Sequence, residues 1–268
     1  MWGYLPLVDK MVNVSVIGCG NMGSAFIKGL AASGEHRITA IDLDPAAREA
    51  VAEYVAETTD DLSVAADSDV IVVAVKPDVV GVVLDELDLT PEHTLVSGAA
   101  GVTTDYVQAR TDANVVRMMP NLATEFGEGA VAVTWTDEPD DDVRAMLDEM
   151  GTFVEIDESL QNLATAVNGS GPAFVFYLLE AMKQVGVEGG FEPEQAEDLA
   201  AQTFKGAAEI VLQADRDVDE LIDAVCSEGG TTIEGMKLLW DSDVQEQVAD
   251  AVRAADDRAE EMSREFHE

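Results

Sequence analysis

The sequence predicts an α/β domain built on a parallel sheet, followed by a domain made only of helices. Between residues 12 and 156, short runs of β-branched residues alternate with amphipathic stretches. The runs are mostly apolar on both faces, as in a parallel sheet that helices cover. From residue 160 onward only helical patterns follow. We therefore expect an extension over residues 1–10, an α/β domain over residues 11–157 and a helical domain over residues 158–268.

The expected elements can be placed in order along the chain. Strands are predicted over residues 12–18, 37–42, 69–75, 93–99, 114–119 and 130–135, and helices between them over residues 21–33, 44–56 and 78–87. Later helices are predicted over residues 160–167, 172–188, 193–214, 217–226, 231–240 and 243–266. The helix that begins at Pro172 is apolar nearly all round, so we expect it to be the buried spine of the second domain.

The charge of the chain excludes several classes of partner. It carries 54 acidic and 15 basic residues, which give a net charge of −39. Such a chain cannot form the basic face that nucleic acid requires, and anionic lipid repels it. Self-repulsion of this size becomes tolerable when salt shortens the range of electrostatic interactions. The composition therefore predicts a halophilic protein from a salt-rich cytoplasm.

Targeting and metal-binding signals are not found in the sequence. Residues 1–10 lack the pattern of a secretory signal, and no apolar run approaches the roughly 20 residues of a membrane helix. We therefore expect a cytoplasmic protein. The two cysteines and three histidines share no metal-ligand spacing, so no metal site is expected.

A glycine-rich turn follows the first predicted strand and opens the first predicted helix. Gly18, Gly20 and Gly23 have the spacing G-x-G-x-x-G, in the context of a dinucleotide-binding motif. The first glycine permits the tight turn, the second lets a pyrophosphate approach the backbone, and the third lets the helix pack on the strand. The helix N-terminus adds free N–H groups and a partial positive charge. The motif favours a Rossmann-type domain, and a tight turn without a ligand is the alternative.

Two residues near this turn bear on the cofactor. Asp42 ends the second predicted strand, close to the position about 20 residues after the first glycine where a carboxylate holds the ribose hydroxyls. No lysine or arginine lies between Ala40 and Pro45 to hold a 2′-phosphate, which favours NADH over NADPH. A surface acid or a helix cap is the alternative interpretation of Asp42. Cys19 is interpreted as a small filler residue, because no base lies near it in the sequence.

Three later loops are predicted at the carboxyl ends of strands, where open α/β sheets bind ligands. These loops are AVKP, SGAAG and RMMPN, at residues 74–77, 97–101 and 117–121. The tiny side chains of the second loop leave room for a flat ring against the backbone.

The helical half contains two more glycine turns. Gly169 and Gly171 precede the apolar helix, where either close helix packing or contact of a ligand with the backbone explains them. Ser227, two glycines and two threonines precede the helix predicted over residues 231–240. This second turn presents N–H groups and hydroxyls to an anion. A cofactor domain followed by a carboxylate-sized cradle suggests reduction of a small carboxylated molecule.

Six stretches together resemble one enzyme family. IGCGNMGSA, AVKP, SGAAGVT, VVRMMPN, NGSGPAF and SEGGTTIEGM occur in this order, and the chain from Met11 on is similar to pyrroline-5-carboxylate reductase. The resemblance implies a Rossmann-type domain and an all-α dimerisation domain, with homodimers that often assemble into larger rings. It also implies reduction of 1-pyrroline-5-carboxylate to L-proline by NADH or NADPH, the last step of proline biosynthesis.

The resemblance also implies roles for individual positions. With Asp42 added from its spacing, the expected cofactor-binding residues are Gly18, Cys19, Gly20, Asn21, Met22, Asp42, Ala74, Val75, Lys76, Pro77, Gly98, Ala99, Ala100 and Asn121. The expected substrate-binding residues are Glu158, Ser227, Gly230, Thr231 and Thr232. Thr232 is the expected catalytic residue, because its hydroxyl matches the one that faces the ring nitrogen in the family.

Four positions depart from the family pattern. Asn168 replaces the usual serine, Glu228 the usual proline, Ala224 a common asparagine, and Asp61 a frequent asparagine near the adenosine. Two other interpretations stay open. One is an imine reductase or β-hydroxyacid dehydrogenase; the latter requires a lysine on the helix from residue 172, whose first lysine is Lys183. The other is a non-catalytic NAD(P)-binding sensor.

Overall fold

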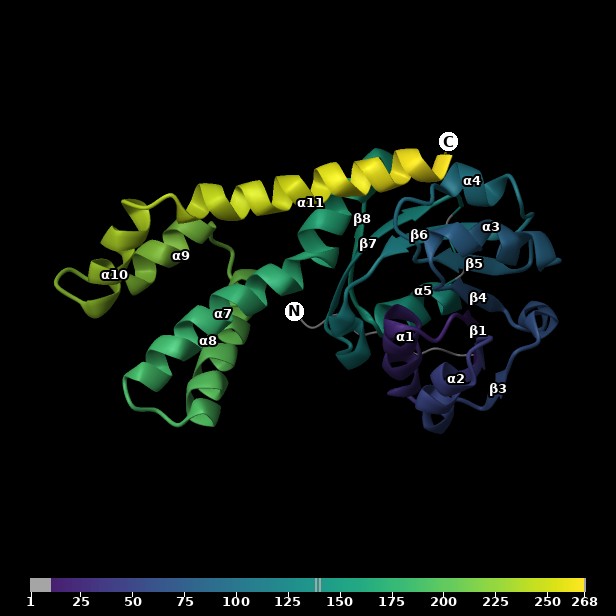
Figure 1. Ribbon diagram of the computed structural model, residues 1–268, viewed down its shortest axis with the longest axis horizontal. Helices are drawn as coiled ribbons and strands as arrows, with labels where there is room; N and C mark the ends of the chain where they lie inside the picture. Colours follow the sequence, from purple (N-terminus) through teal and green to yellow (C-terminus); the bar gives the residue numbers. More distant parts are fainter. Residues whose placement is uncertain (1–10, 138, 140, 268) are drawn as a thin grey trace. The chain divides into compact units, whose positions relative to one another are not determined.

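The structure, a computed structural model, describes residues 11–137, 139 and 141–267 (Figure 1). The predicted extension over residues 1–10 lies outside the described residues. Contacts divide the chain into two compact units: unit 1 within Met1–Ser170 and Ala254–Glu268, and unit 2 over Gly171–Arg253. The expected domain boundary after residue 157 rests on the change from strands to helices and stays a prediction.

Unit 1 is built on an eight-stranded sheet with the order β3-β2-β1-β4-β5-β6-β7-β8. The strands are β1 (Asn13–Ile17), β2 (Arg37–Ile41), β3 (Glu57–Thr59), β4 (Val70–Val73), β5 (Thr94–Ser97), β6 (Asn114–Met119), β7 (Gly129–Trp135) and β8 (Gly151–Glu155). Neighbouring strands are parallel except for β6 and β7, which run antiparallel. The chain leaves β1 toward one edge and returns at β4 on the other side of β1, so the strand order reverses there.

Helices cover both faces of this sheet, and each face has its own apolar core (Figure 1). One core joins the sheet to α1 (Asn21–Ala31), α2 (Pro45–Val51) and α5 (Asp141–Asp148), and the other joins it to α3 (Pro77–Glu86) and α4 (Thr104–Gln108). Successive residues of β4 enter the two cores alternately and are fully buried. This confirms the prediction of a mostly parallel sheet whose strands are apolar on both faces.

The six predicted strands are all present, and the two strands that the prediction missed form the edges of the sheet. β3 is a three-residue polar strand, Glu-Thr-Thr, without the β-branched apolar run that marks the inner strands. β8 begins at Gly151, whose φ of 138° is strained for any other residue. A Cβ there would lie 2.1 Å from the Gly129 carbonyl oxygen. Such edge strands depend on contacts made by the folded chain.

Beyond residue 155 the described residues form helices only, as predicted. Short helical turns cover Glu158–Leu160, Gln161–Ala164 (α6) and Thr165–Gly169, and long helices follow. These are α7 (Gly171–Glu188), α8 (Pro193–Gln213), α9 (Val218–Val225), α10 (Thr231–Trp240) and α11 (Val244–His267). None of the helices in the described part of the chain has the length and apolar character that a membrane crossing needs.

The expectation that the helix after Pro172 is a buried spine is wrong for the single chain. No residue of α7 is buried within it. Phe176, Tyr177 and Val185 are 63%, 79% and 67% exposed. The helix is as apolar as predicted, but one copy of the chain does not supply the surface that covers it.

Candidate functional site

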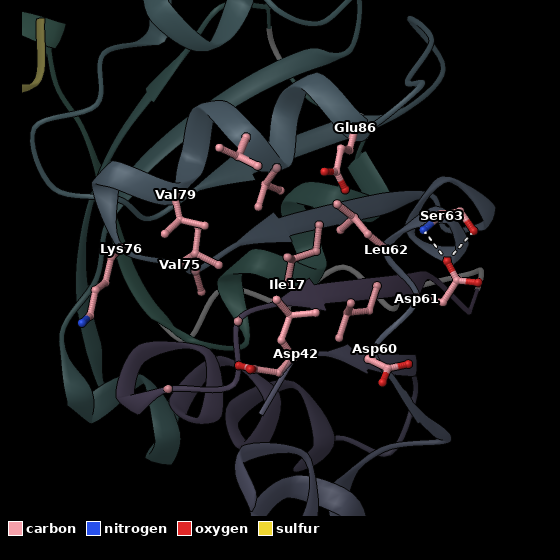
Figure 2. A pocket seen from close by; sticks show the side chains of 17 residues that line it. Ile17, Asp42, Asp60, Asp61, Leu62, Ser63, Val75, Lys76, Val79 and Glu86 are labelled. Atoms are coloured by element: carbon pink, nitrogen blue, oxygen red, sulfur yellow. Dashed lines mark hydrogen bonds between the residues drawn. The ribbon is translucent and has the colours of Figure 1, made fainter. Parts of the chain in front are cut away.

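A crevice opens at the point where the strand order of the sheet reverses. It lies at the carboxyl ends of β1, β2 and β4 and has a volume of about 760 Å³ (Figure 2). Open α/β sheets bind ligands at this position. Val75 and Val79 line the side formed by α3, and Asp42 and Asp60 lie across from them (Figure 2). The predicted cofactor residues that line the crevice are Gly18, Gly20, Asp42, Ala74, Val75 and Lys76.

The three glycines of the first turn have three different surroundings. Gly18 has a φ of 95°, and a Cβ there would lie 2.8 Å from the Ala74 carbonyl oxygen. A Cβ on Gly23 would lie 1.8 Å from the Gly18 carbonyl oxygen. At Gly20 a Cβ would meet no described atom within 4 Å. The first and third glycines are therefore required by packing, whereas the second leaves open space.

The turn leads into the N-terminus of α1, where a ligand anion would meet free backbone N–H groups. Ser24 Oγ donates a hydrogen bond to the Cys19 carbonyl at 2.8 Å and holds the turn closed. The first turn of α1 contains no acidic residue, in a chain with 54 of them. No carboxylate of that turn therefore competes for the N–H groups of Asn21 and Met22.

Asp42 is bound to the backbone around the turn. Its Oδ2 accepts a hydrogen bond from the Cys19 N–H at 2.7 Å, and its Oδ1 accepts one from the Asp44 N–H at 2.8 Å. The cap of α2 is Asp44, which accepts from the Ala46 N–H. Asp42 is therefore not a helix cap. Each of its carboxylate oxygens still has a lone pair for a ribose hydroxyl.

Arg48 is a residue of this region that the sequence prediction missed. It lies on α2, and its Nη1 donates to the Asp42 carbonyl oxygen. Its Nη2 lies 3.7 Å from Asp60 Oδ2. Arg48 lies outside the stretch from Ala40 to Pro45 in which a cation for a 2′-phosphate would be expected. It lies one helical turn after the Asp44 cap, a spacing that brings its side chain back to the end of β2.

Carboxylates dominate the rim of the crevice. Asp42, Asp60, Asp61 and Glu86 line it together with Lys76. Hydrogen bonds from the hydroxyl and backbone N–H of Ser63 hold the pKa of Asp61 below its usual value (Figure 2). Asp61, the departure from the family's asparagine, therefore stays ionised beside the crevice.

Cys19 fits the packing role that its place in the turn suggested. Its side chain is buried in the apolar core on the α1 face. Burial, with a smaller contribution from the charge of Asp42, raises the pKa of the Cys19 thiol to about 11. The thiol is protonated at neutral pH and is a poor nucleophile.

The loops after β5 and β6 belong to the same edge of the sheet but do not line the crevice. Gly98, Ala99 and Ala100 follow β5, and a Cβ on Gly98 would meet no described atom within 4 Å. Asn121 follows β6; its Oδ1 accepts from the Ala123 N–H, and its Nδ2 donates to the Asn168 carbonyl.

Asn168 explains part of the second glycine turn. Its Nδ2 donates to the Met119 carbonyl at 2.6 Å and to the Ala130 carbonyl at 2.8 Å. One amide therefore ties the ends of β6 and β7 together, which a serine hydroxyl with its single donor cannot do. Gly169 lies beside Met119, because a Cβ there would be 3.7 Å from the Met119 sulfur. This distance is an ordinary contact, and a Cβ on Gly171 would meet no described atom within 4 Å, so packing within one chain does not explain the two glycines.

Glu158 forms an ion pair inside unit 1. Arg117 Nη1 donates to Glu158 Oε1 at 2.5 Å, and the Thr104 N–H donates to the same oxygen at 3.2 Å. The Arg117 side chain is 3% exposed and that of Glu158 is 32% exposed. Arg117 Nε and Nη2 and Glu158 Oε2 are buried without a partner among the described residues. Glu158 therefore joins β6 to the start of α4, and its predicted role in substrate binding stays a prediction.

The third glycine turn lies in unit 2, at the start of α10. Gly230 is the N-cap of α10, and no side chain of the described residues caps this helix. The Gly230 N–H donates to the Ser227 carbonyl at 3.0 Å, and a Cβ on Gly230 would lie 2.5 Å from Ser227 Oγ. Thr231 and Thr232 occupy the first turn of α10 and are exposed. The backbone of Gly230 and the hydroxyls of Ser227, Thr231 and Thr232 thus lie close together in sequence at the N-terminus of α10.

The structure gathers the predicted residues into two groups in different units. The cofactor residues and Glu158 lie in unit 1, and Ser227, Gly230, Thr231 and Thr232 lie in unit 2. His36 and His93 directly precede β2 and β5, at the amino ends of those strands and away from the crevice. In the part of the chain that the structure describes, no cluster of His, Cys, Asp and Glu could hold a metal ion.

Both parts of the chain match families of known proteins. Residues 158–262 match a family model described as pyrroline-5-carboxylate reductase dimerisation, and residues 13–101 match one described as NADP oxidoreductase, coenzyme F420-dependent. The pyrroline-5-carboxylate reductase of Methanosarcina acetivorans is 34% identical over 264 residues, covering 94% of this chain and 98% of the relative.

Two solved structures have the same fold over nearly their whole length. The pyrroline-5-carboxylate reductase of Coxiella burnetii has a TM-score of 0.82 and 30% identity, covering 94% of this chain and 99% of that one. The pyrroline carboxylate reductase of Plasmodium falciparum with NADP bound has a TM-score of 0.81 and 28% identity, covering 94% and 98%.

The Arg117–Glu158 pair gives an asymmetric prediction. Glu158→Leu leaves the buried Arg117 charge unpaired and should lower the free energy of unfolding by about 3–5 kcal/mol. Arg117→Met should cost less, because the Glu158 side chain is 32% exposed against 3% for Arg117 and its Oε1 keeps the hydrogen bond from the Thr104 N–H. The double variant should be more stable than Glu158→Leu alone. Urea unfolding at one protein concentration measures all three, and equal losses in the two single variants would contradict this account of the pair.

Proposed function

Because the chain belongs to the pyrroline-5-carboxylate reductase family, we propose that it reduces 1-pyrroline-5-carboxylate to L-proline with NAD(P)H. The structure supports the proposal independently of family membership, through the combination of two features. The chain has open space over Gly20 at one helix N-terminus and a hydroxyl-lined glycine turn from Ser227 to Thr232 at another. The first suits the pyrophosphate of a dinucleotide, and the second suits a small carboxylate.

The residues present fit the chemistry of imine reduction. NAD(P)H supplies the hydride when bound, and a cyclic imine is basic enough to arrive partly protonated. The chain then has to orient two reactants and exclude water, which is mainly a task of positioning. No strong general acid is required, in agreement with the positions of His36 and His93 away from the crevice. In this proposal Ser227, Gly230 and the Thr231 backbone hold the carboxylate, and the Thr232 hydroxyl faces the ring nitrogen.

A β-hydroxyacid dehydrogenase is less well supported. Its base would be a lysine on α7, and the first lysine of that helix is Lys183. Lys183 forms ion pairs with Glu197 at 2.5 Å and Glu180 at 3.5 Å. The hydrogen bond to Glu197 raises the pKa of Lys183 above its usual value, so the amine is protonated at neutral pH and cannot act as a base.

A substrate panel tests the proposed reaction. The oxidation of NADH and of NADPH is followed in molar KCl with 1-pyrroline-5-carboxylate, with an acyclic imine and without substrate. Oxidation of a 3-hydroxy acid is followed with NAD⁺ and NADP⁺. We expect turnover only with the pyrroline. Turnover of the hydroxy acid alone would support a dehydrogenase, and cofactor binding without any turnover would support a sensor.

Thr232 should be the side chain to which the rate is most sensitive. It is exposed in the first turn of α10, where it makes no cap, so its role is not explained by helix stability. Thr232→Val should lower kcat by about 10²-fold, because it removes a donor whose hydrogen bond strengthens in the transition state. The thermal midpoint should stay near that of the wild type. Thr231→Val is the matched control and should have a mild effect, and Thr232→Ser should keep most of the activity. Wild-type kcat in Thr232→Val would refute the assignment.

NADH should be preferred over NADPH. Asp42, Asp60, Asp61 and Glu86 surround the crevice, and the nearby Arg48 is engaged by Asp60 and by the Asp42 carbonyl. A 2′-phosphate would therefore meet more negative than free positive charge. We expect a higher kcat/KM for NADH at fixed salt. Asp60→Asn should shift the ratio toward NADPH by releasing Arg48. A tenfold wild-type preference for NADPH would overturn the proposal.

The helical part should form a homodimer. The apolar side chains of α7 and α8 are exposed in one chain, among them Phe176, Tyr177, Leu199 and Leu212. The match of residues 158–262 to a dimerisation model supports a second copy as their cover. Sedimentation in molar salt should give twice the chain mass of 28.6 kDa, or a multiple of it if dimers form rings. An active monomer would contradict this. Larger rings and a cytoplasmic location stay predictions.

The fold should require salt. A net charge of −39 on 268 residues repels itself, and at about 1 M salt the Debye length falls to about 3 Å. We expect the thermal midpoint and the activity to rise steeply from about 0.1 M toward molar KCl. The same series in sucrose separates screening from preferential exclusion. A thermal midpoint that does not change with KCl would end the proposal of a halophilic protein.

A further inference from the structure

The end of α11 packs against the loop that follows β5. Ser263 Oγ donates a hydrogen bond to the Gly101 carbonyl at 3.2 Å. A Cβ on Gly101 would lie 3.2 Å from the backbone nitrogen and Cα of Ser263. The φ of Gly101 is 79°, in the left-handed region. Two features therefore favour glycine at this position, the left-handed backbone and the helix backbone that lies against it. The sequence alone did not suggest the second.

Aromatic contacts extend this packing into the rest of unit 1. The Phe266 ring meets Tyr106 of α4 edge to face, with centroids 4.6 Å apart (Figure 1 shows the end of α11 beside α4). The Arg110 guanidinium lies 3.6 Å from the Tyr106 ring centroid. A Cβ on Gly81 of α3 would be 2.5 Å from the Tyr106 hydroxyl. The end of α11 therefore contacts α4, α4 contacts α3, and α3 lines the cofactor crevice.

The loop from Gly98 to Gly101 is anchored at its start and has few side-chain contacts after that. The Gly98 N–H donates to the Val73 carbonyl at 3.2 Å, and Ala99 is buried in the core on the α3 face. The rest of the loop is Ala100 and Gly101, and glycine has large backbone freedom. Space is open at Gly98, whereas α11 covers Gly101. A flat ring could therefore lie against the loop at Gly98, while α11 packs against the loop at Gly101.

We propose that the last turns of α11, residues 259–266, position the nicotinamide loop, with Ser263 and Gly101 as positioning residues of the cofactor site. This inference rests on the proposed function and on the expectation that Gly98, Ala99 and Ala100 bind the nicotinamide end of the cofactor. α11 begins at Val244 in unit 2 and ends in unit 1. The contacts that carry the inference, between residues 259–266 and the loop, lie within unit 1.

Two ligands separate positioning of the ring from general stability. NADH requires both the crevice and the loop, whereas ADP-ribose fills the crevice and lacks the nicotinamide. Isothermal titration in molar KCl measures both dissociation constants. Gly101→Ala should weaken NADH binding by about tenfold, because a small displacement of the loop misplaces the ring, and should change ADP-ribose binding less than twofold. Ser263→Ala should weaken NADH binding by about two- to tenfold through the loss of one hydrogen bond.

Gly34→Ala is the matched control for backbone strain. Gly34 has a φ of 71°, and a Cβ there would meet no described atom within 4 Å. It should change neither dissociation constant, although it carries the same left-handed strain. A chain that ends at Glu260 lacks Ser263 and Phe266 and should bind NADH weakly. Gly101→Ala in that shortened chain should weaken NADH binding less than it does in the full chain, because the clash with the helix is gone and only the left-handed strain remains.

Three outcomes would overturn the proposal. These are NADH and ADP-ribose binding that weaken together, unchanged NADH binding in Ser263→Ala, and independent effects of Gly101→Ala and the shortened chain. Ser263→Ala retains the backbone and keeps the test informative if the shortened chain does not fold. The measurement needs no imine. A protein that binds NADH through α11 but does not reduce pyrroline-5-carboxylate would refute the proposed function alone.

Discussion

The cofactor half of this protein depends on how closely its first helix approaches the turn before it. A Cβ at Gly23 would lie 1.8 Å from the Gly18 carbonyl oxygen, and one at Gly18 would lie 2.8 Å from the Ala74 carbonyl. β1, α1 and the end of β4 therefore meet at backbone distance. This approach aims the N-terminus of α1 at the crevice and leaves its open space at Gly20. The place where strand order reverses thereby becomes a place where an anion can be held.

Around the glycine turn, hydrogen bonds and an ion pair connect strands, helices and loops in addition to the packing of the apolar cores. Asp42 ties β2 to the glycine turn, Asn168 ties β6 to β7, and Glu158 ties β6 to α4. The first two links use a side chain to anchor backbone at the ends of strands, where regular hydrogen bonding stops, and the third pairs a buried cation and caps the start of a helix. The same strand ends carry the candidate cofactor loops. Much of the polar chemistry near the site therefore fixes the loops rather than touching a ligand.

The sequence predicted most of the features that depend on local pattern, although the short helices α4 and α5 were missed. Apolar runs indicated all the inner strands, and helical periodicity indicated the long helices within a few residues of their observed ends. Features that depend on distant contacts were missed. Ser263 meets Gly101 across 162 residues of sequence. Arg48 is a local miss, because it lies only six residues from Asp42, beyond the stretch from Ala40 to Pro45 in which a cation for a 2′-phosphate would be expected. Glu158 and Arg117 gave no pairing signal, since ion pairs between distant elements have no periodicity. For α7 the sequence indicated the apolar side chains correctly but not their exposure. A single chain does not provide the surface that would bury them.

The large excess of acidic residues restricts which groups of this chain can bind an anion. In a chain with 54 acidic residues, an anion site made of lysine or arginine would be neutralised by neighbours, as Arg48 is by Asp60 and Lys183 by Glu197. The two candidate anion positions instead use backbone N–H groups and hydroxyls, at the starts of α1 and α10. Such dipoles are fixed by the fold and carry no net charge that a neighbouring carboxylate could pair with. An acidic protein can therefore bind a pyrophosphate and a carboxylate without building a basic patch.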